Sequence, residues 1–193
     1  NLAVIMTNGR NSFYLDREPT GEKFATFVGE ELLEYCRSTF GLSRKAEDTF
    51  IAGLSMGGFG ALRTGLAYSR NYSKIAALSS ALIIHQLRDM KPEDTNPMAN
   101  YAYYANIFGD LQTARERDCN PEVLVRQKLA AGEKLPEIFM ACGSEDFLIE
   151  PNRAFRDFLK ASGVPCAYHE SPGIHDWKFW NEYLEPAIAW MVG

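Results

Sequence analysis

Short apolar runs alternate along the chain with longer stretches in which apolar residues fall three and four positions apart. A short apolar run fits a buried strand, and the longer spacing fits one face of a helix. Strands that alternate with helices are typical of βαβ units, so the pattern predicts a parallel sheet covered by helices. The strands are expected at residues 2–6, 49–54, 75–79, 138–142 and 166–170.

Helical spacing fills most of the segments between these runs. Gly41 is a suitable helix stop, and Pro151 suits the first turn of a helix, where no N–H donor is needed. The predicted helices span residues 20–40, 56–68, 151–162 and 177–191. Residues 80–134 follow no strand pattern, and their proline, asparagine and aromatic content predicts an irregular helical insertion. Because no linker or repeat interrupts the pattern, we expect one domain over residues 1–193.

Composition and charge exclude some functions without naming one. The 193 residues are 46% hydrophobic and 23% charged, which is ordinary for a globular domain. The net charge of −5, with no long run of one sign, argues against nucleic acid or an anionic membrane as the partner. The four cysteines, Cys36, Cys119, Cys142 and Cys166, form no C-x-x-C pair, so they predict no metal site. Cys142 and Cys166 lie in apolar, strand-like runs and are expected to be reduced core residues, which fits a cytoplasmic protein.

The run Gly53-Leu54-Ser55-Met56-Gly57 lies between a predicted strand and a predicted helix. In this context a G-x-S-x-G motif is typical of a nucleophile elbow, in which a sharp turn exposes the serine hydroxyl above the sheet. The residues two positions before and after the serine must be small, because larger side chains would collide with neighbouring elements. The alternative is a glycine-rich turn with no catalytic role, which a G-x-S-x-G motif without a flanking strand and helix would fit equally well. The strand and helix around it favour Ser55 as a nucleophile.

A nucleophilic serine needs a base that accepts its proton and a carboxylate that orients the base. In a fold with this elbow the chain order is serine, acid, histidine, each on a loop after a strand. His175 follows the last predicted strand on a glycine-containing loop. His85 lies in the insertion and His169 lies inside a predicted strand. We therefore predict that His175 is the base.

The acid is expected on the loop that follows residues 138–142. This loop offers Glu145, Asp146 and Glu150, and the spacing favours Asp146 because the loop turns back over the sheet at that position. Asp176 is the weaker candidate, since adjacent residues such as Asp176 and His175 point in different directions.

Three motifs together resemble one family. They are residues 53–58 (Gly-Leu-Ser-Met-Gly-Gly), 143–148 (Gly-Ser-Glu-Asp-Phe-Leu) and 173–177 (Gly-Ile-His-Asp-Trp). The chain is similar to the putative-esterase family around esterase D, which includes S-formylglutathione hydrolases, feruloyl esterases, acetylxylan esterases and tributyrin esterases, and it is most like the bacterial tributyrin branch. The resemblance implies an α/β-hydrolase three-layer sandwich with a mostly parallel sheet. It also implies Ser55 as nucleophile, Asp146 as acid, His175 as base, the Met56 amide as one oxyanion donor, and no cofactor.

The front of the chain departs from the family pattern. The family carries its second oxyanion donor on a loop with a His-Gly pair, after a strand upstream of the position of residues 2–6. That strand normally lies between residues 2–6 and residues 49–54 in the sheet. We therefore expect a sheet that lacks its first strands, and a natural protein that extends further at its N-terminus.

The resulting functional hypothesis is a serine carboxylesterase that forms an acyl-enzyme. It would hydrolyse short-chain or aromatic acyl esters, including acetyl or feruloyl esters of sugars. The expected partner is a small-molecule ester, and the sequence does not decide whether the protein forms a homo-oligomer. Tyr14 and Trp177 lie beside predicted strand ends and are candidate substrate-binding residues. Two alternatives remain: an acyltransferase on the same fold, and a non-catalytic scaffold that has kept the α/β-hydrolase fold.

Overall fold

The computed structural model describes residues 2–17 and 20–193, and its main sheet has four parallel strands. The strands lie in the order β3-β4-β5-β6, so β3 and β6 form the two edges. A short antiparallel ribbon, β1 (Asp16–Arg17) and β2 (Glu22–Lys23), precedes the main sheet. The main strands are β3 (Phe50–Leu54), β4 (Lys74–Leu78), β5 (Glu137–Gly143) and β6 (Cys166–Ser171).

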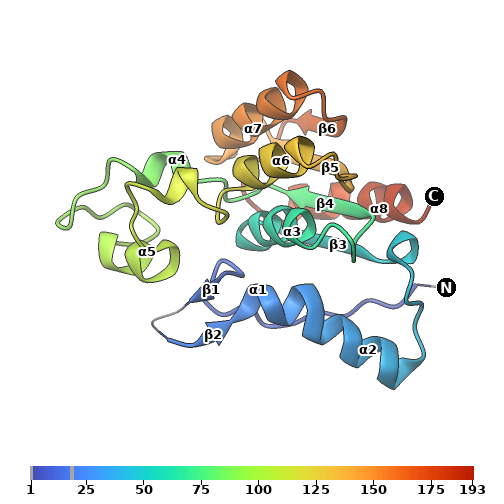
Figure 1. Ribbon diagram of the computed structural model, residues 1–193. Helices are drawn as coiled ribbons and strands as arrows, with labels where there is room; N and C mark the ends of the chain where they lie inside the picture. The colour runs from blue at the N-terminus through green and yellow to red at the C-terminus, as the bar shows by residue number, and fades with distance from the viewer. Residues whose placement is uncertain (1, 18–19) are drawn as a thin grey trace.

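Helices cover both faces of the main sheet (Figure 1). Side chains alternate between the two faces of a strand, so Ile75 and Ala77 of β4 pack towards one layer while Ala76 and Leu78 pack towards the other. The first layer contains α3 (Met56–Ala67), α6 (Pro121–Ala130) and α7 (Ile149–Ala161), and the second contains α8 (Trp177–Val192). Because both faces are buried, the inner strands β4 and β5 are apolar along most of their length. The three-layer α/β fold expected from the sequence is confirmed.

Four of the five expected strands are confirmed, and the strand expected at residues 2–6 is wrong. Residues 2–8 adopt no regular secondary structure, and the side chains of Leu2, Val4, Ile5 and Met6 are exposed. An apolar segment becomes a strand only where a neighbouring strand satisfies its backbone hydrogen bonds. The family pattern puts one strand between this segment and β3, and within residues 2–17 and 20–193 no strand occupies that place.

The expected helices form, with shifted starts. The first begins at Phe24 instead of Thr20, because residues 22–23 pair with β1. It continues from α1 (Phe24–Thr26) through a π-helical turn (Phe27–Glu31) into α2 (Leu32–Phe40), which ends at Gly41 with a φ of 63°. α7 begins two residues before Pro151, which is still within the first turn. Among the described residues, no helix combines the length and apolar character needed to cross a membrane.

Residues 80–134 form the expected irregular helical insertion. It contains α4 (Ile84–Leu87), α5 (Tyr101–Phe108) and α6, joined by turns and a 3-10 segment. α4 and α5 share a hydrophobic cluster with Phe13 and with Phe59 of α3, whereas α6 packs on α3 over the sheet. The insertion therefore extends the core beyond the end of the sheet (Figure 1).

The parallel arrangement gathers the predicted site residues at one edge of the sheet. Ser55 follows β3, Asp146 lies on the loop after β5, and His175 lies on the loop after β6. Because carboxyl ends of parallel strands meet at the same side, these three loops approach one another although they are far apart in the sequence.

Candidate active site

Ser55 occupies a tight turn between β3 and α3. Its φ of 55° and ψ of −118° lie in a region that L-residues rarely adopt. The turn is held by the end of β4 and by the segment that follows it: Ser55 N–H donates to the Leu78 carbonyl at 2.9 Å, and the Ser55 carbonyl accepts from Ala81 N–H at 3.0 Å. The strained turn is thus fixed by backbone bonds on both its N–H and its C=O.

The two glycines of the motif, Gly53 and Gly57, have different surroundings. A Cβ on Gly53 would lie 2.2 Å from the Gly57 carbonyl oxygen, so Gly53 cannot become larger without moving backbone. A Cβ on Gly57 meets no described atom within 4 Å. The expectation that both glycines avoid a collision is therefore confirmed for Gly53 and not met at Gly57 among the described residues.

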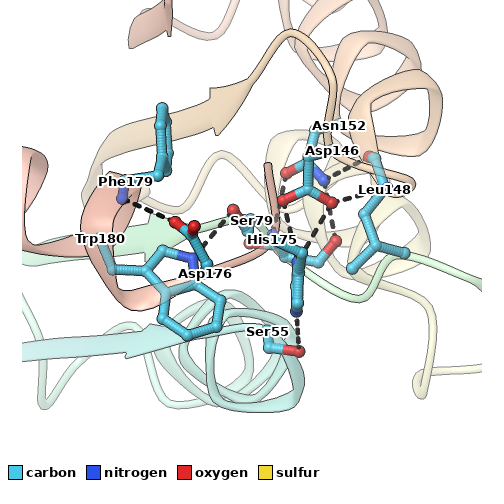
Figure 2. A network of polar contacts seen from close by, with 10 residues as sticks. Ser55, Ser79, Asp146, Leu148, Asn152, His175, Asp176, Phe179 and Trp180 are labelled. Carbon is cyan, nitrogen blue, oxygen red and sulfur yellow. Dashed lines mark hydrogen bonds and ion pairs between the residues drawn. The ribbon is translucent and has the colours of Figure 1, made fainter. Parts of the chain in front are cut away.

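The three predicted polar side chains form one hydrogen-bonded series, shown in Figure 2. The Ser55 Oγ lies 2.9 Å from His175 Nε2. On the other side of the ring, His175 Nδ1 lies 2.9 Å from Asp146 Oδ2 and 3.1 Å from Oδ1. With Nδ1 protonated and bound to the carboxylate, Nε2 is the acceptor that faces the serine hydroxyl. This arrangement can remove a proton from Ser55 as its oxygen attacks.

Asp146 is buried, with only 2% of its surface exposed. Burial alone would raise the pKa of this carboxyl, but hydrogen bonds from His175, the Leu148 N–H and the Ser79 hydroxyl together lower the pKa below its ordinary value. The Leu148 N–H lies 2.8 Å from Oδ1. The group is therefore held ionised at neutral pH, as a carboxylate that stabilises an imidazolium must be.

The His175 ring is held by aromatic side chains as well as by its polar partners. Phe147 lies 4.7 Å away between ring centroids, and Trp180 lies 4.9 Å away with its plane nearly perpendicular. The loop that precedes His175 approaches β5 closely: a Cβ added to Gly143 would lie 2.2 Å from the Gly173 carbonyl oxygen. These contacts fix the ring orientation that both hydrogen bonds require.

The competing acids have other roles. Asp176 caps α8, where its carboxylate accepts from Phe179 N–H at 3.0 Å. Glu145 contacts the hydroxyl of Ser144 at the surface, and Glu150 pairs with Arg153. The geometry therefore brings Asp146, and none of these three, to the histidine.

The other two histidines lie away from this series. His85 pairs with Glu122 at 2.8 Å within the insertion. His169 lies in β6 and packs against Phe139, with ring centroids 4.8 Å apart. Both are placed where the sequence suggested, one in the insertion and one within a strand.

The first turn of α3 lies directly below the serine. Met56 is the first residue of this helix, and the N–H groups of a first helical turn have no partner within the helix. The Met56 amide as an oxyanion donor stays a prediction, as does the second donor expected from an earlier loop.

The candidate substrate-binding residues occupy different environments. The Tyr14 ring packs closely over Gly9 and Gly60, and Tyr14 itself has a φ of 54°. Trp177 begins α8, is 66% exposed, and contacts Trp180 edge-on at 5.3 Å between centroids. A cavity of about 340 Å³ lies beside the His175 loop, lined by Glu145, Pro172, Gly173, Ile174, Asp176, Lys178, Phe179 and Glu182.

Two polar residues near the site escaped the sequence reasoning. Ser79 follows β4 and is fully buried, and Asn152 of α7 is fully buried as well. The amide of Asn152 bridges the Ser80 backbone and the Leu148 carbonyl, with its Nδ2 donating at 2.9 and 2.8 Å. For Ser79 the sequence contained a signal, because a polar residue directly after a buried parallel strand lies at the edge of the sheet where sites form.

Cys142 of β5 lies behind the acid. It is a free, fully buried thiol, and burial together with the nearby Asp146 carboxylate raises its pKa to about 12. The other cysteines are also free, and Cys36 and Cys119 are buried while Cys166 is half-buried. The expected core position is confirmed for Cys142 and holds in part for Cys166.

Comparison with known proteins identifies the family. Residues 3–191 match the model of the family described as "Putative esterase". A Caldicellulosiruptor saccharolyticus protein described as an acetyl esterase is 47% identical over 191 residues, which are 99% of this chain and 72% of the relative.

Solved structures from Staphylococcus aureus are similar in fold. The fluorophosphonate-binding serine hydrolase FphF, with substrate bound, superposes with a TM-score of 0.83 and 30% identity, covering 96% of this chain and 69% of that one. The apoenzyme of the S-formylglutathione hydrolase FrmB gives a TM-score of 0.80 and 30% identity, covering 96% of this chain and 70% of that one.

The parallel sheet, the strained serine turn and these similarities define an α/β-hydrolase-type serine hydrolase. Within that class, the chain belongs to the esterase family whose model it matches, and it is a serine carboxylic ester hydrolase.

Proposed function

We propose that this protein hydrolyses short-chain acyl esters, with acetyl esters preferred, through an acyl-enzyme on Ser55. The observation that carries the proposal is the continuous series from the Ser55 hydroxyl through His175 to the buried Asp146 carboxylate. Preference for a short acyl group is supported by the 47% identity to the acetyl esterase. Longer and aromatic acyl groups are the competing substrates.

The reaction proceeds in two similar halves. Ser55 Oγ attacks the ester carbonyl while His175 Nε2 accepts its proton, and the ionised Asp146 stabilises the imidazolium that forms. The developing oxyanion is held by the Met56 N–H and by a second donor. His175 then protonates the departing alcohol, which leaves an acetyl group on Ser55. Water, activated by His175, attacks this ester and releases acetate and free serine.

The proposal is tested by substrate preference and by covalent labelling. The chain would be assayed with p-nitrophenyl acetate, butyrate, octanoate and ferulate esters, and separately treated with a fluorophosphonate followed by peptide mass analysis. We expect the highest kcat/KM with acetate and a mass shift on the peptide that contains Ser55. Ser55→Ala should lose on the order of 10⁶ in kcat and all labelling.

A matched control is Ser144→Ala, a serine at the surface of the acid loop, which should behave as the wild type. Labelling of a different residue, or turnover that survives Ser55→Ala, would refute the assignment of the nucleophile. A preference for octanoate or ferulate would refute the acetyl preference while leaving the nucleophile in place.

A further inference from the structure

Two aromatic rings border the imidazole of His175, and they differ in exposure. Trp180 is buried, with 8% of its surface exposed, and its indole Nε1–H donates to Ser79 Oγ at 3.1 Å. Phe147 lies 4.7 Å from the imidazole between ring centroids, at an interplanar angle of 51°, and is 59% exposed. Of these two rings, Phe147 is therefore the one that a molecule approaching His175 from solvent can meet.

The exposure of Phe147 follows from the turn that holds the acid. Its neighbours Asp146 and Leu148 are buried. The Leu148 N–H donates to Asp146 Oδ1 at 2.8 Å, and the Ile149 N–H donates to the Asp146 carbonyl at 3.0 Å. The backbone on the C-terminal side of Phe147 is thus fixed by the acid itself, and the same turn leaves the phenyl ring at the surface beside the base.

A second exposed aromatic ring comes from the start of α8. Trp177 is 66% exposed and contacts Trp180 edge-on at 5.3 Å, and Trp180 in turn contacts His175 at 4.9 Å. Single exposed apolar side chains are normal on a protein surface, whereas neighbouring ones mark contacts with a ligand or a partner. Phe147 and Trp177 together form an apolar surface around the base, the aromatic rim.

The chemistry of ester hydrolysis decides which half of the ester meets this rim. When the acyl-enzyme forms, the bond between the acyl carbon and the alcohol oxygen breaks, the acyl group stays on Ser55 Oγ, and the proton on His175 Nε2 passes to the alcohol oxygen. The departing oxygen must therefore lie about 3 Å from Nε2. The carbon skeleton of the alcohol then extends beside the imidazole, where Phe147 lies, while the acyl group stays at the serine.

Charged side chains near the base loop restrict the charge of this alcohol. The cavity beside that loop is lined by the carboxylates of Glu145, Asp176 and Glu182 and by the ammonium group of Lys178. The excess of carboxylates gives this region a negative potential, which repels an anionic alcohol. An uncharged alcohol with an apolar face is complementary to both the rim and its surroundings.

We propose that Phe147 and Trp177 form the subsite for the alcohol half of the ester, and that this subsite selects uncharged alcohols that carry an aromatic ring. Aromatic rings attract one another in edge-to-face or offset arrangements with centroids about 4.5–7 Å apart, so the rim favours a ring over a short alkyl chain. The inference rests on the proposed function, because the proton transfer from His175 is what places the alcohol.

The test keeps the acetyl group constant and varies the alcohol. We would measure kcat/KM for ethyl acetate, benzyl acetate and 4-carboxybenzyl acetate, with the benzyl-to-ethyl ratio as the readout. Phe147→Ala and Trp177→Ala should each lower this ratio about threefold to tenfold, because each removes an aromatic contact that ethanol cannot make. Any loss of support for the imidazole slows both esters alike and cancels in the ratio. In the wild type, 4-carboxybenzyl acetate should be a poorer substrate than benzyl acetate by a similar factor.

Two further variants serve as controls. Phe147→Tyr retains an aromatic ring and should retain the wild-type ratio. Phe40→Ala is the matched control, because Phe40 ends α2 and is 63% exposed, and it should leave kcat/KM for all three esters unchanged. A ratio that is unchanged in Phe147→Ala and in Trp177→Ala would mean that these rings make no alcohol subsite, and equal rates with benzyl and 4-carboxybenzyl acetate would overturn the selection for uncharged alcohols.

Failure of the proposed function is recognised separately. If no acetate ester is hydrolysed, or if turnover survives Ser55→Ala, the proposed function fails, and binding of benzyl alcohol to the Ser55→Ala chain decides this inference without turnover. Benzyl alcohol should shift the NMR resonance of the Trp177 indole N–H, with a Kd raised about threefold to tenfold when Phe147→Ala is added. A resonance that does not shift, or a Kd that does not change, would overturn the subsite.

Discussion

The backbone strain at Ser55 predicts that removing the nucleophile with glycine stabilises the protein more than removing it with alanine. Both Ser55→Gly and Ser55→Ala lose the Ser55 Oγ bond to His175, so the contribution of that bond cancels in the comparison. The remaining difference is conformational. Alanine at a φ of 55° retains the strain, whereas glycine adopts this conformation without a Cβ clash.

The expected size of the difference follows from two opposing effects. A non-glycine residue in a sparsely populated backbone region costs about 1–3 kcal/mol. Glycine in place of alanine costs about 0.4–1 kcal/mol through the greater freedom of the unfolded chain. Ser55→Gly should therefore exceed Ser55→Ala by about 1–2 kcal/mol in free energy of unfolding. For a chain of 193 residues this corresponds to a Tm difference of roughly 2–8 °C.

The comparison is measured by urea unfolding followed by circular dichroism, with calorimetry as a second probe. Both variants should be inactive, because both lack the Ser55 hydroxyl. Equal stability of the two variants, or a more stable Ser55→Ala, would show that the turn stores no such strain.

Further predictions concern packing, ionisation and substrate binding. Gly143→Ala forces a Cβ against the Gly173 carbonyl, so it should cost about 1–3 kcal/mol in urea unfolding and over tenfold in kcat, whereas Gly57→Ala, with open space, should leave stability within about 0.5 kcal/mol. Because the folded-state pKa of Asp146 is lowered, its contribution to stability is present above the unfolded pKa of about 3.9 and is lost as pH falls through the folded value. Asp146→Asn should thus be more destabilising at pH 7 than at pH 3 in unfolding curves, and equal effects would contradict this. If Trp177 binds substrate, Trp177→Ala should raise KM with little change in Tm, since the side chain is 66% exposed; an unchanged KM would remove it from the binding site.

The elements that the sequence predicted are those whose signals are local. Gly53 and Ser55 mark a turn whose strand and helix are each visible in a few residues, and the loops of Asp146 and His175 follow strands with clear apolar runs. Their meeting follows from parallel topology, because each carboxyl end faces the same edge.

Features that depend on distant partners could not be read in this way. Residues 2–6 have the composition of a strand, but pairing requires a neighbour that local sequence cannot supply. The place of Ser79 depends on Trp180, which is 101 positions away, and on a φ of 43° that no local pattern marks. The different surroundings of Gly53 and Gly57 likewise depend on the folded structure, while the motif alone treats both of its glycines alike.

The buried thiol behind the acid gives the site a chemical selectivity. Thiolates, rather than thiols, react with oxidants and alkylating reagents, and a Cys142 pKa of about 12 leaves almost no thiolate at neutral pH. Iodoacetamide and peroxide should therefore spare the interior next to Asp146, even though a cysteine lies beside it. The site therefore contains two nucleophilic side chains, Cys142 and Ser55, and only the Ser55 hydroxyl is expected to react with reagents that enter from solvent.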